Sequence, residues 1–160
     1  MATAHHNLSE FDSATVPSGT GKTFYLVVSE WNTAITEALY EGAVSVLTSF
    51  EVAPENIIRW NVPGSFELIY GAKKAQEKKP DAVIAIGSVI QGETPHFDFI
   101  CQGVAQGIKD LNVQSQVPVI FCVLTDNTLE QAQARSGGKH GNKGKEAAVA
   151  ALKMAALGQL

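Results

Sequence analysis

The sequence comprises 160 residues, of which 45% are hydrophobic and 18% charged, and its formal net charge at pH 7 is −4. This length suits one domain with a sizeable core, and the mild negative charge argues against nucleic acid or an anionic membrane surface as a partner, because both require clustered positive charge. No apolar run is long enough to span a membrane, and the amino-terminal stretch lacks the apolar core of a secretory signal.

Residues 1–22 form a polar lead that we expect to be mobile, and a single domain is expected over residues 23–160. Within this domain, short apolar runs rich in strand-forming residues predict strands that are covered on both faces, as in a parallel sheet. The predicted strands cover residues 24–28, 57–60, 82–86 and 118–124.

Helical patterns lie between these strands. Pro80 should end the second helix, because a proline ring disfavours a helical predecessor. Thr128 and Gln131 have the spacing of a capping box that opens a shorter helix, and Gly158 suits the end of the last one. The predicted helices cover residues 33–50, 65–79, 95–111, a short segment after Thr128, and 143–157. For the helix over 95–111, the apolar spacing predicts one buried face made of Phe97, Ile100, Cys101, Val104, Ala105, Ile108 and Leu111.

Alternating strands and helices predict an α/β fold, a three-layer α/β/α sandwich with a four-stranded parallel sheet of the flavodoxin-like kind. Ligands of open α/β sheets bind at the carboxyl ends of the strands. The first three strands are followed there by an aromatic residue, a carboxylate and a histidine, within the stretches SEWN, NVPGSFE and GSVIQGETPH. Their meeting at one edge of the sheet predicts a functional site.

The GETPH stretch (92–96) combines Gly92, a potential N-cap in Thr94, and Pro95 at the first helical position. The free N–H groups and the positive dipole end of the following helix favour an anion, and phosphate fits best. The pattern is neither a Walker loop nor GxGxxG, so a nucleotide is not indicated. An ordinary capped helix start explains the same residues equally well.

His96 should point toward the strand ends, where a neutral imidazole can accept or pass on a proton. A structural histidine is the competing interpretation. Glu67 is either a ligand-binding carboxylate or an acid that suits the start of a helix. Trp31 either stacks on a planar ligand or covers the end of the sheet. The link RSGGKHGNKG (135–144) is a flexible turn, or it supplies Arg135 and nearby lysines to a phosphate.

The two cysteines, Cys101 and Cys122, have no metal-ligand spacing and favour a reducing compartment, so a cytoplasmic protein is expected. Both lie in apolar patterns, which predicts that they are buried small side chains.

Together, the stretches SEWN, VPGSFE, GSVIQGETPHFDFIC, PVIFCVLT with NTLEQAQAR, and SGGKHGNKGKEAA resemble the lumazine synthase family, over about residues 24–157. The resemblance implies condensation of 5-amino-6-(D-ribitylamino)uracil with 3,4-dihydroxy-2-butanone 4-phosphate. The product is 6,7-dimethyl-8-ribityllumazine, in the penultimate step of riboflavin biosynthesis. It implies no cofactor and no metal.

Residue roles follow from the same resemblance. His96 transfers protons. Trp31 replaces an aromatic residue that is often phenylalanine, and Pro95 stands where the family varies. The pyrimidinedione and ribityl groups are expected to contact Trp31, Ser65, Phe66, Glu67, Ser88, Val89, Ile90 and Phe121, and the phosphate is expected to contact Glu93, Thr94 and Arg135.

The resemblance also implies pentamers with sites shared between neighbouring subunits. Arg135 lies about 12 Å along its helix from the fourth strand, so it should reach a neighbour's site more easily than its own. Pentamer and sixty-subunit icosahedral shell both stay open, and riboflavin synthase is a candidate partner. Two other functions compete with the enzyme: a non-catalytic lumazine- or flavin-binding module of the same fold, and a mainly structural shell.

Overall fold

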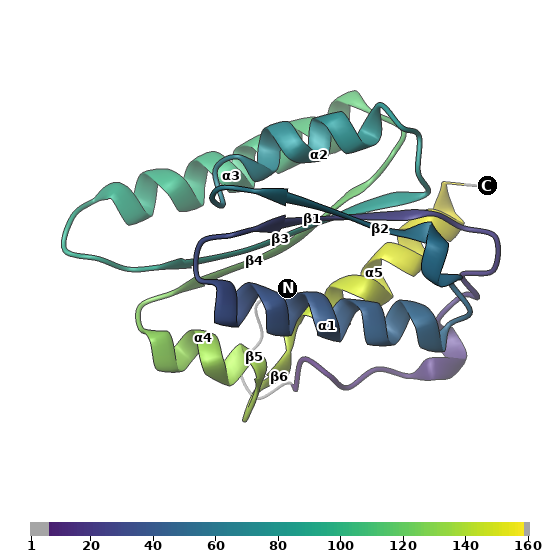
Figure 1. Ribbon diagram of the computed structural model, residues 1–160, viewed down its shortest axis with the longest axis horizontal. Helices are drawn as coiled ribbons and strands as arrows, with labels where there is room; N and C mark the ends of the chain where they lie inside the picture. Colours follow the sequence, from purple (N-terminus) through teal and green to yellow (C-terminus); the bar gives the residue numbers. More distant parts are fainter. Residues whose placement is uncertain (1–6, 159–160) are drawn as a thin grey trace.

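The computed structural model describes residues 7–158, and Figure 1 shows three layers, with a twisted sheet between two layers of helices. The sheet is parallel and four-stranded, with strand order β2-β1-β3-β4. Its strands are β1 (Phe24–Ser29), β2 (Ile57–Val62), β3 (Ala82–Ile90) and β4 (Val119–Asp126). The predicted α/β sandwich with a four-stranded parallel sheet is therefore confirmed.

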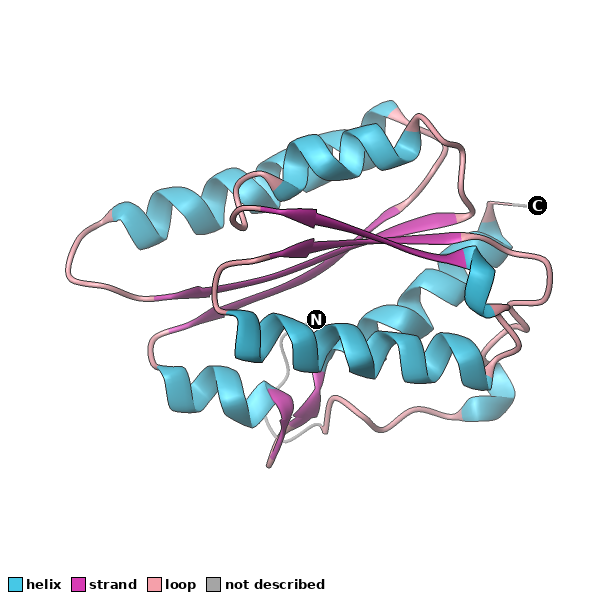
Figure 2. Cartoon of the chain, in the orientation of Figure 1, coloured by secondary structure: helices cyan, strands magenta, loops and turns pink. Residues whose placement is uncertain are grey.

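Two helices, α2 (Leu68–Gln76) and α3 (His96–Gln114), cover one face of the sheet. The other face carries α1 (Thr33–Ser49), α4 (Leu129–Arg135) and α5 (Lys143–Leu157), as Figures 1 and 2 show. Two 3-10 turns, Ser13–Thr15 and Pro54–Asn56, lie outside these layers. Each connection from a strand through a helix to the next parallel strand is the βαβ unit that the alternating pattern predicted.

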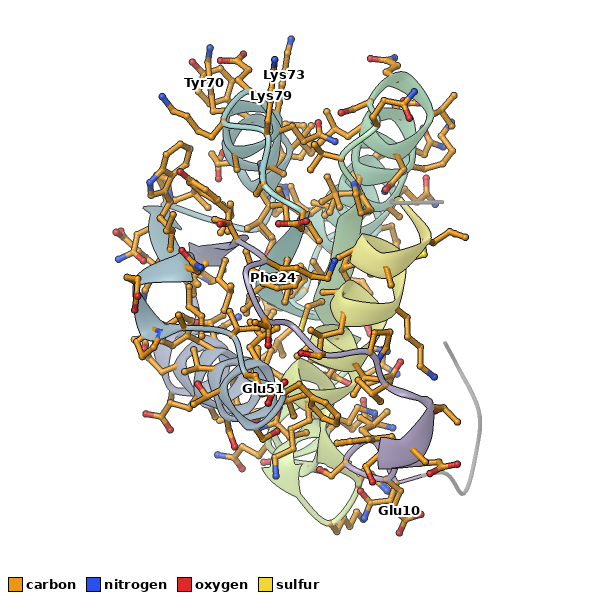
Figure 3. The ribbon with its side chains drawn as sticks, turned by 90° about the vertical axis from the view of Figure 1, so that its right-hand side faces the viewer. Glu10, Phe24, Glu51, Tyr70, Lys73 and Lys79 are labelled. Atoms are coloured by element: carbon orange, nitrogen blue, oxygen red, sulfur yellow. The ribbon has the colours of Figure 1, made fainter. Side chains whose placement is uncertain are left out.

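Alternate side chains of the strands enter two separate apolar cores. On β3, Ile84 and Ile86 pack toward α1 and α5, whereas Val83 and Ala85 pack toward α2 and α3. All four are fully buried. Figure 3 looks onto the amino ends of the strands and places Phe24, the first residue of β1, between the two helical layers. A central parallel strand buried on both sides has no polar face, which explains its continuous apolar sequence.

The outer strands differ from the prediction that all four are covered on both faces. The residues of β2 are half-buried or exposed, and Phe121 and Thr125 of β4 are exposed. Both strands are edges of the sheet, so each has a neighbour on one side only. On β2 the guanidinium of Arg59 donates to both carboxylate oxygens of Glu37 on α1.

Helix boundaries also depart from the pattern. The second helix begins at Leu68 instead of residue 65, because residues 65–67 form a turn, and it ends at Gln76, with Lys79 in a left-handed conformation (φ 55°) before Pro80. The third helix runs on to Gln114. Thr128 caps α4 as predicted, accepting from the Gln131 N–H at 3.3 Å.

The predicted buried face of α3 is only partly correct. Val104, Ile108 and Leu111 are buried, but Ala105 is exposed. Cys101 is half-buried, so its expected burial is wrong, whereas Cys122 on β4 is fully buried as expected. The reason is that α3 lies over the edge strand β4, and only part of its apolar stripe meets the sheet.

The link between α4 and α5 is an ordered hairpin of β5 (Ser136–Gly138) and β6 (Gly141–Asn142), not an irregular turn. Gly137 and Gly141 adopt positive φ angles of 124° and 83°, which other residues rarely adopt. The amino-terminal segment touches this hairpin, since the Leu8 N–H donates to the His140 carbonyl at 2.8 Å. Among residues 7–158, none of the helices has the length and apolar character that a bilayer crossing requires.

Candidate active site

A cavity of about 510 Å³ lies where the carboxyl ends of β1, β2 and β3 converge, and it extends to the start of α3. This is the edge of the sheet at which the sequence placed the site. The cavity is lined by Trp31, Asn32, Gly64, Ser65, Phe66, Glu67, Ser88, Val89, Ile90, Gly92, Thr94, His96, Phe97 and Ile100.

The turn after β1 fixes one wall of the cavity. Asn32 has a left-handed backbone (φ 58°, ψ 47°), which asparagine tolerates better than most residues, and its side-chain amide donates to the Ser88 carbonyl at 2.9 Å. The Trp31 N–H donates to the Pro63 carbonyl at 3.2 Å. The backbone is therefore tied to the two neighbouring strands, while the indole is 73% exposed and free to stack on a planar ligand.

The turn after β2 forms the opposite wall. Ser65 is buried against β3, and a Cβ at Gly87 would lie 2.6 Å from the Ser65 Oγ, so only glycine allows this approach. Phe66 packs over Gly103 of α3 and leaves 49% of its surface exposed. Glu67 immediately precedes α2 and lines the cavity with an exposed side chain. The wall thus combines an aromatic ring, a hydroxyl and a carboxylate.

The floor of the cavity contains two hydroxyls without a partner. The Oγ atoms of Ser65 and Ser88 are buried and have no hydrogen bond among the described residues. A buried polar atom left unpaired costs about 1–3 kcal/mol, so a hydrogen bond to water or to a ligand would stabilise each of these hydroxyls. The half-buried Val89 and Ile90 continue the floor toward the start of α3.

The GETPH stretch forms the rim. Thr94 and His96 are exposed and line the cavity, so His96 points toward the strand ends as predicted. The predicted cap is wrong: Pro95 occupies the N-cap position of α3, and its carbonyl accepts from the Asp98 and Phe99 N–H groups. No side chain within residues 7–158 caps the helix. The first turn of α3 therefore keeps its positive end at the rim, which favours a bound anion.

A model of the 6,7-dimethyl-8-ribityllumazine synthase family matches residues 21–159 of the sequence. The chain belongs to this family. A relative of that name from Christiangramia forsetii is 63% identical over 159 residues, covering 98% of this chain and 95% of the relative. A second, from Flavobacterium johnsoniae, is 64% identical and covers 99% and 84%. A third, from Porphyromonas gingivalis, is 58% identical and covers 98% of both chains.

Most of the residues that the family resemblance singled out line the cavity. Three do not: Glu93, Phe121 and Arg135. Phe121 pairs with Ala85 in the middle of β4, before that strand reaches the carboxyl edge. Arg135 ends α4, on the α1–α5 side of the sheet, whereas the cavity is bounded by α3 on the other side.

The sequence prediction omitted residues that shape the site through backbone geometry. Asn32 holds the turn after β1 against Ser88. Gly87 and Gly64 make room for Ser65 and for the Glu67 carboxylate, whose Oε2 lies 2.9 Å from where a Gly64 Cβ would stand. Glycine inside a strand is a recognised signal of close approach, and Gly87 follows directly after the predicted third strand.

Proposed function

We propose that the protein condenses 5-amino-6-(D-ribitylamino)uracil with 3,4-dihydroxy-2-butanone 4-phosphate to give 6,7-dimethyl-8-ribityllumazine, phosphate and water. The observation that carries this proposal is the composition of one cavity. It offers exposed aromatic rings for a flat heterocycle, unpartnered serine hydroxyls for a polar ligand, and a histidine beside a helix start that favours an anion. The names of the relatives support the same reaction.

The heterocycle binds between the aromatic walls in this proposal. Trp31 stacks on the pyrimidinedione, and Phe66 closes the opposite side. The Ser65 and Ser88 hydroxyls and the backbone of Val89 and Ile90 hold the ring edge. Glu67, at the exposed side of the cavity, accepts hydrogen bonds from the ribityl hydroxyls, which an ionised carboxylate does well.

The butanone phosphate binds at the rim. Backbone N–H groups of Glu93 and Thr94, with the dipole of α3, face the phosphate, and Arg135 neutralises it. The amine of the uracil attacks the ketone and forms an imine with loss of water. Phosphate is then eliminated, and the second nitrogen attacks the remaining carbonyl, so that the second ring closes with loss of a second water. His96 takes and returns the protons of these steps, while much of the rate comes from holding the two substrates together.

Assembly is part of the proposal, because Arg135 and Phe121 do not line the cavity of their own chain. In a pentamer of the family type, a neighbouring subunit supplies both residues, and twelve pentamers can close into an icosahedral shell. Riboflavin synthase, which acts on the product, is a candidate partner. We place the enzyme in the cytoplasm, consistent with its two unpaired cysteines.

The test is direct. Purified protein is mixed with both substrates, and lumazine formation is followed by absorbance and fluorescence against the spontaneous condensation. The native protein should accelerate formation, and His96→Ala should slow it. His140→Ala is a matched control, because His140 is exposed and lies outside the cavity. Ligand binding without acceleration would instead support a non-catalytic binding module.

A further inference from the structure

The carboxylate of Asp126, at the last position of β4, is buried beside Arg135. Its side chain is 7% exposed, and its Oδ1 lies 3.8 Å from a terminal nitrogen of the Arg135 guanidinium. The other oxygen, Oδ2, is buried and has no hydrogen-bond partner among the described residues. Burial raises the pKa of the Asp126 carboxyl, and the nearby guanidinium only partly opposes this effect.

This pair differs from the other arginine–carboxylate pair that the structure describes. Arg59 and Glu37 form a two-point contact, with hydrogen bonds from both terminal nitrogens to both oxygens. The Arg135 nitrogen nearest Asp126 instead donates a hydrogen bond to the Gln131 carbonyl, at 3.0 Å. The contact between Asp126 and Arg135 is therefore loose, and a large part of the guanidinium fork is left for another acceptor.

The two positions also differ in access. The Arg135 side chain is 38% exposed, while the Asp126 side chain is almost fully buried at the end of β4. The backbone of Asp126 is fixed, because its carbonyl accepts from the Gln91 N–H at 3.0 Å, next to the GETPH stretch. Solvent therefore reaches the Arg135 guanidinium but hardly reaches the Asp126 carboxylate.

We propose that Asp126 is a positioning residue that acts through Arg135: its carboxylate lies behind the guanidinium at the carboxyl edge of the sheet and lowers the affinity of Arg135 for phosphate. This inference rests on the proposed function, in which Arg135 binds the phosphate of the butanone substrate. A negative charge behind the guanidinium offsets part of its attraction for a phosphate in front. The offset matters because inorganic phosphate is also a product and must leave after each turnover.

The experiment is titration calorimetry of the assembled protein with inorganic phosphate. Asp126→Asn keeps the shape of the side chain and removes its charge, so the Kd for phosphate should fall about two- to fivefold, the range expected for a partly exposed ion pair. In kinetics, the KM for the butanone phosphate and the inhibition constant of phosphate should fall by a similar factor, and the KM for the ribitylaminouracil should stay constant. A merely structural role would not separate the two substrates in this way.

Three controls make the result decisive. Arg135→Ala should weaken phosphate binding, and Glu37→Gln, in the distant surface pair, should leave it unchanged. Asp126→Thr serves as a second uncharged variant, because threonine suits a strand, in case the asparagine variant folds poorly. A Kd for phosphate that stays constant or rises in both Asp126 variants overturns the inference. If the native protein does not form lumazine at all, the proposed function fails separately, and the calorimetry still decides the role of Asp126.

Discussion

Replacing Gly87 by alanine should disturb the part of the cavity in which the heterocycle is proposed to bind, and the same change should destabilise the fold. The added Cβ would lie 2.6 Å from the Ser65 Oγ and 2.8 Å from Cδ1 of Leu68, which is fully buried. Overpacking of this kind costs about 1–3 kcal/mol, and the lower entropy of the unfolded chain offsets about 0.4–1 kcal/mol of it. We therefore expect the free energy of unfolding to fall, by up to about 2.5 kcal/mol.

Urea unfolding measures the loss of stability, and steady-state kinetics should show a raised KM for the ribitylaminouracil, because Ser65 must move. Gly92→Ala is the matched control: a Cβ there meets nothing within 4 Å, so the stability should stay within about 0.5 kcal/mol of the native value. A Gly87→Ala protein with native stability and a native KM would refute the argument that this glycine sets the floor of the site.

Three further predictions address the site, the thiols and a surface ion pair. His96→Ala should lower kcat about a hundredfold or more with little change in KM, whereas Arg135→Ala should mainly raise the KM for the butanone phosphate. Steady-state kinetics with normal turnover in both variants would contradict the assignment. A thiol reagent at mildly alkaline pH should modify Cys101 slowly and leave Cys122 untouched until the protein unfolds, because burial raises the pKa of the Cys122 thiol to about 12. Mass spectrometry counts the modified thiols, and rapid modification of both cysteines in the folded protein would contradict this prediction. The Arg59 guanidinium lowers the pKa of the Glu37 carboxyl below its usual value of 4.5. The ionised carboxylate therefore stabilises the fold above pH 4.5, and this stabilisation is lost as the pH falls through the lowered pKa. Glu37→Gln should thus cost about 0.5 kcal/mol or less at neutral pH and nothing in strong acid, as urea unfolding at the two pH values would reveal.

Much of the fold could be read from the sequence, because local pattern and tertiary structure agree along the centre of the sheet. The apolar run of β3 has to be buried on both faces, and the ring of Pro80 prevents the preceding helix from continuing. The exposure of the two edge strands could not be predicted in this way. Strand order is decided by long-range packing, so nothing local tells that β4 is an edge and that Phe121 is exposed.

The cavity could be placed from the sequence because the carboxyl ends of parallel strands share one edge. The contacts that shape the inside of the cavity could not be predicted from the sequence. The turn at residues 65–67 replaces the predicted first turn of α2, since Ser65 packs onto Gly87 and tertiary contact prevails over helix propensity. The left-handed backbone of Asn32, and the Ser88 Oγ that has no hydrogen-bond partner within residues 7–158, become visible only once the strands are in register.

The separation of His96 from Arg135 leads to a last prediction. His96 lines the cavity, whereas Arg135, the last residue of α4, does not line it. If each site combines the histidine of one subunit with the arginine of the next, His96→Ala and Arg135→Ala chains should complement each other. In pentamers refolded from equal amounts of both, about a quarter of the sites receive both native residues by chance, so about a quarter of the native activity should return. Each variant refolded alone is the control. Activity in the mixture no higher than the mean of the two variants would mean that the site is built within one chain, and Arg135 would then need another role.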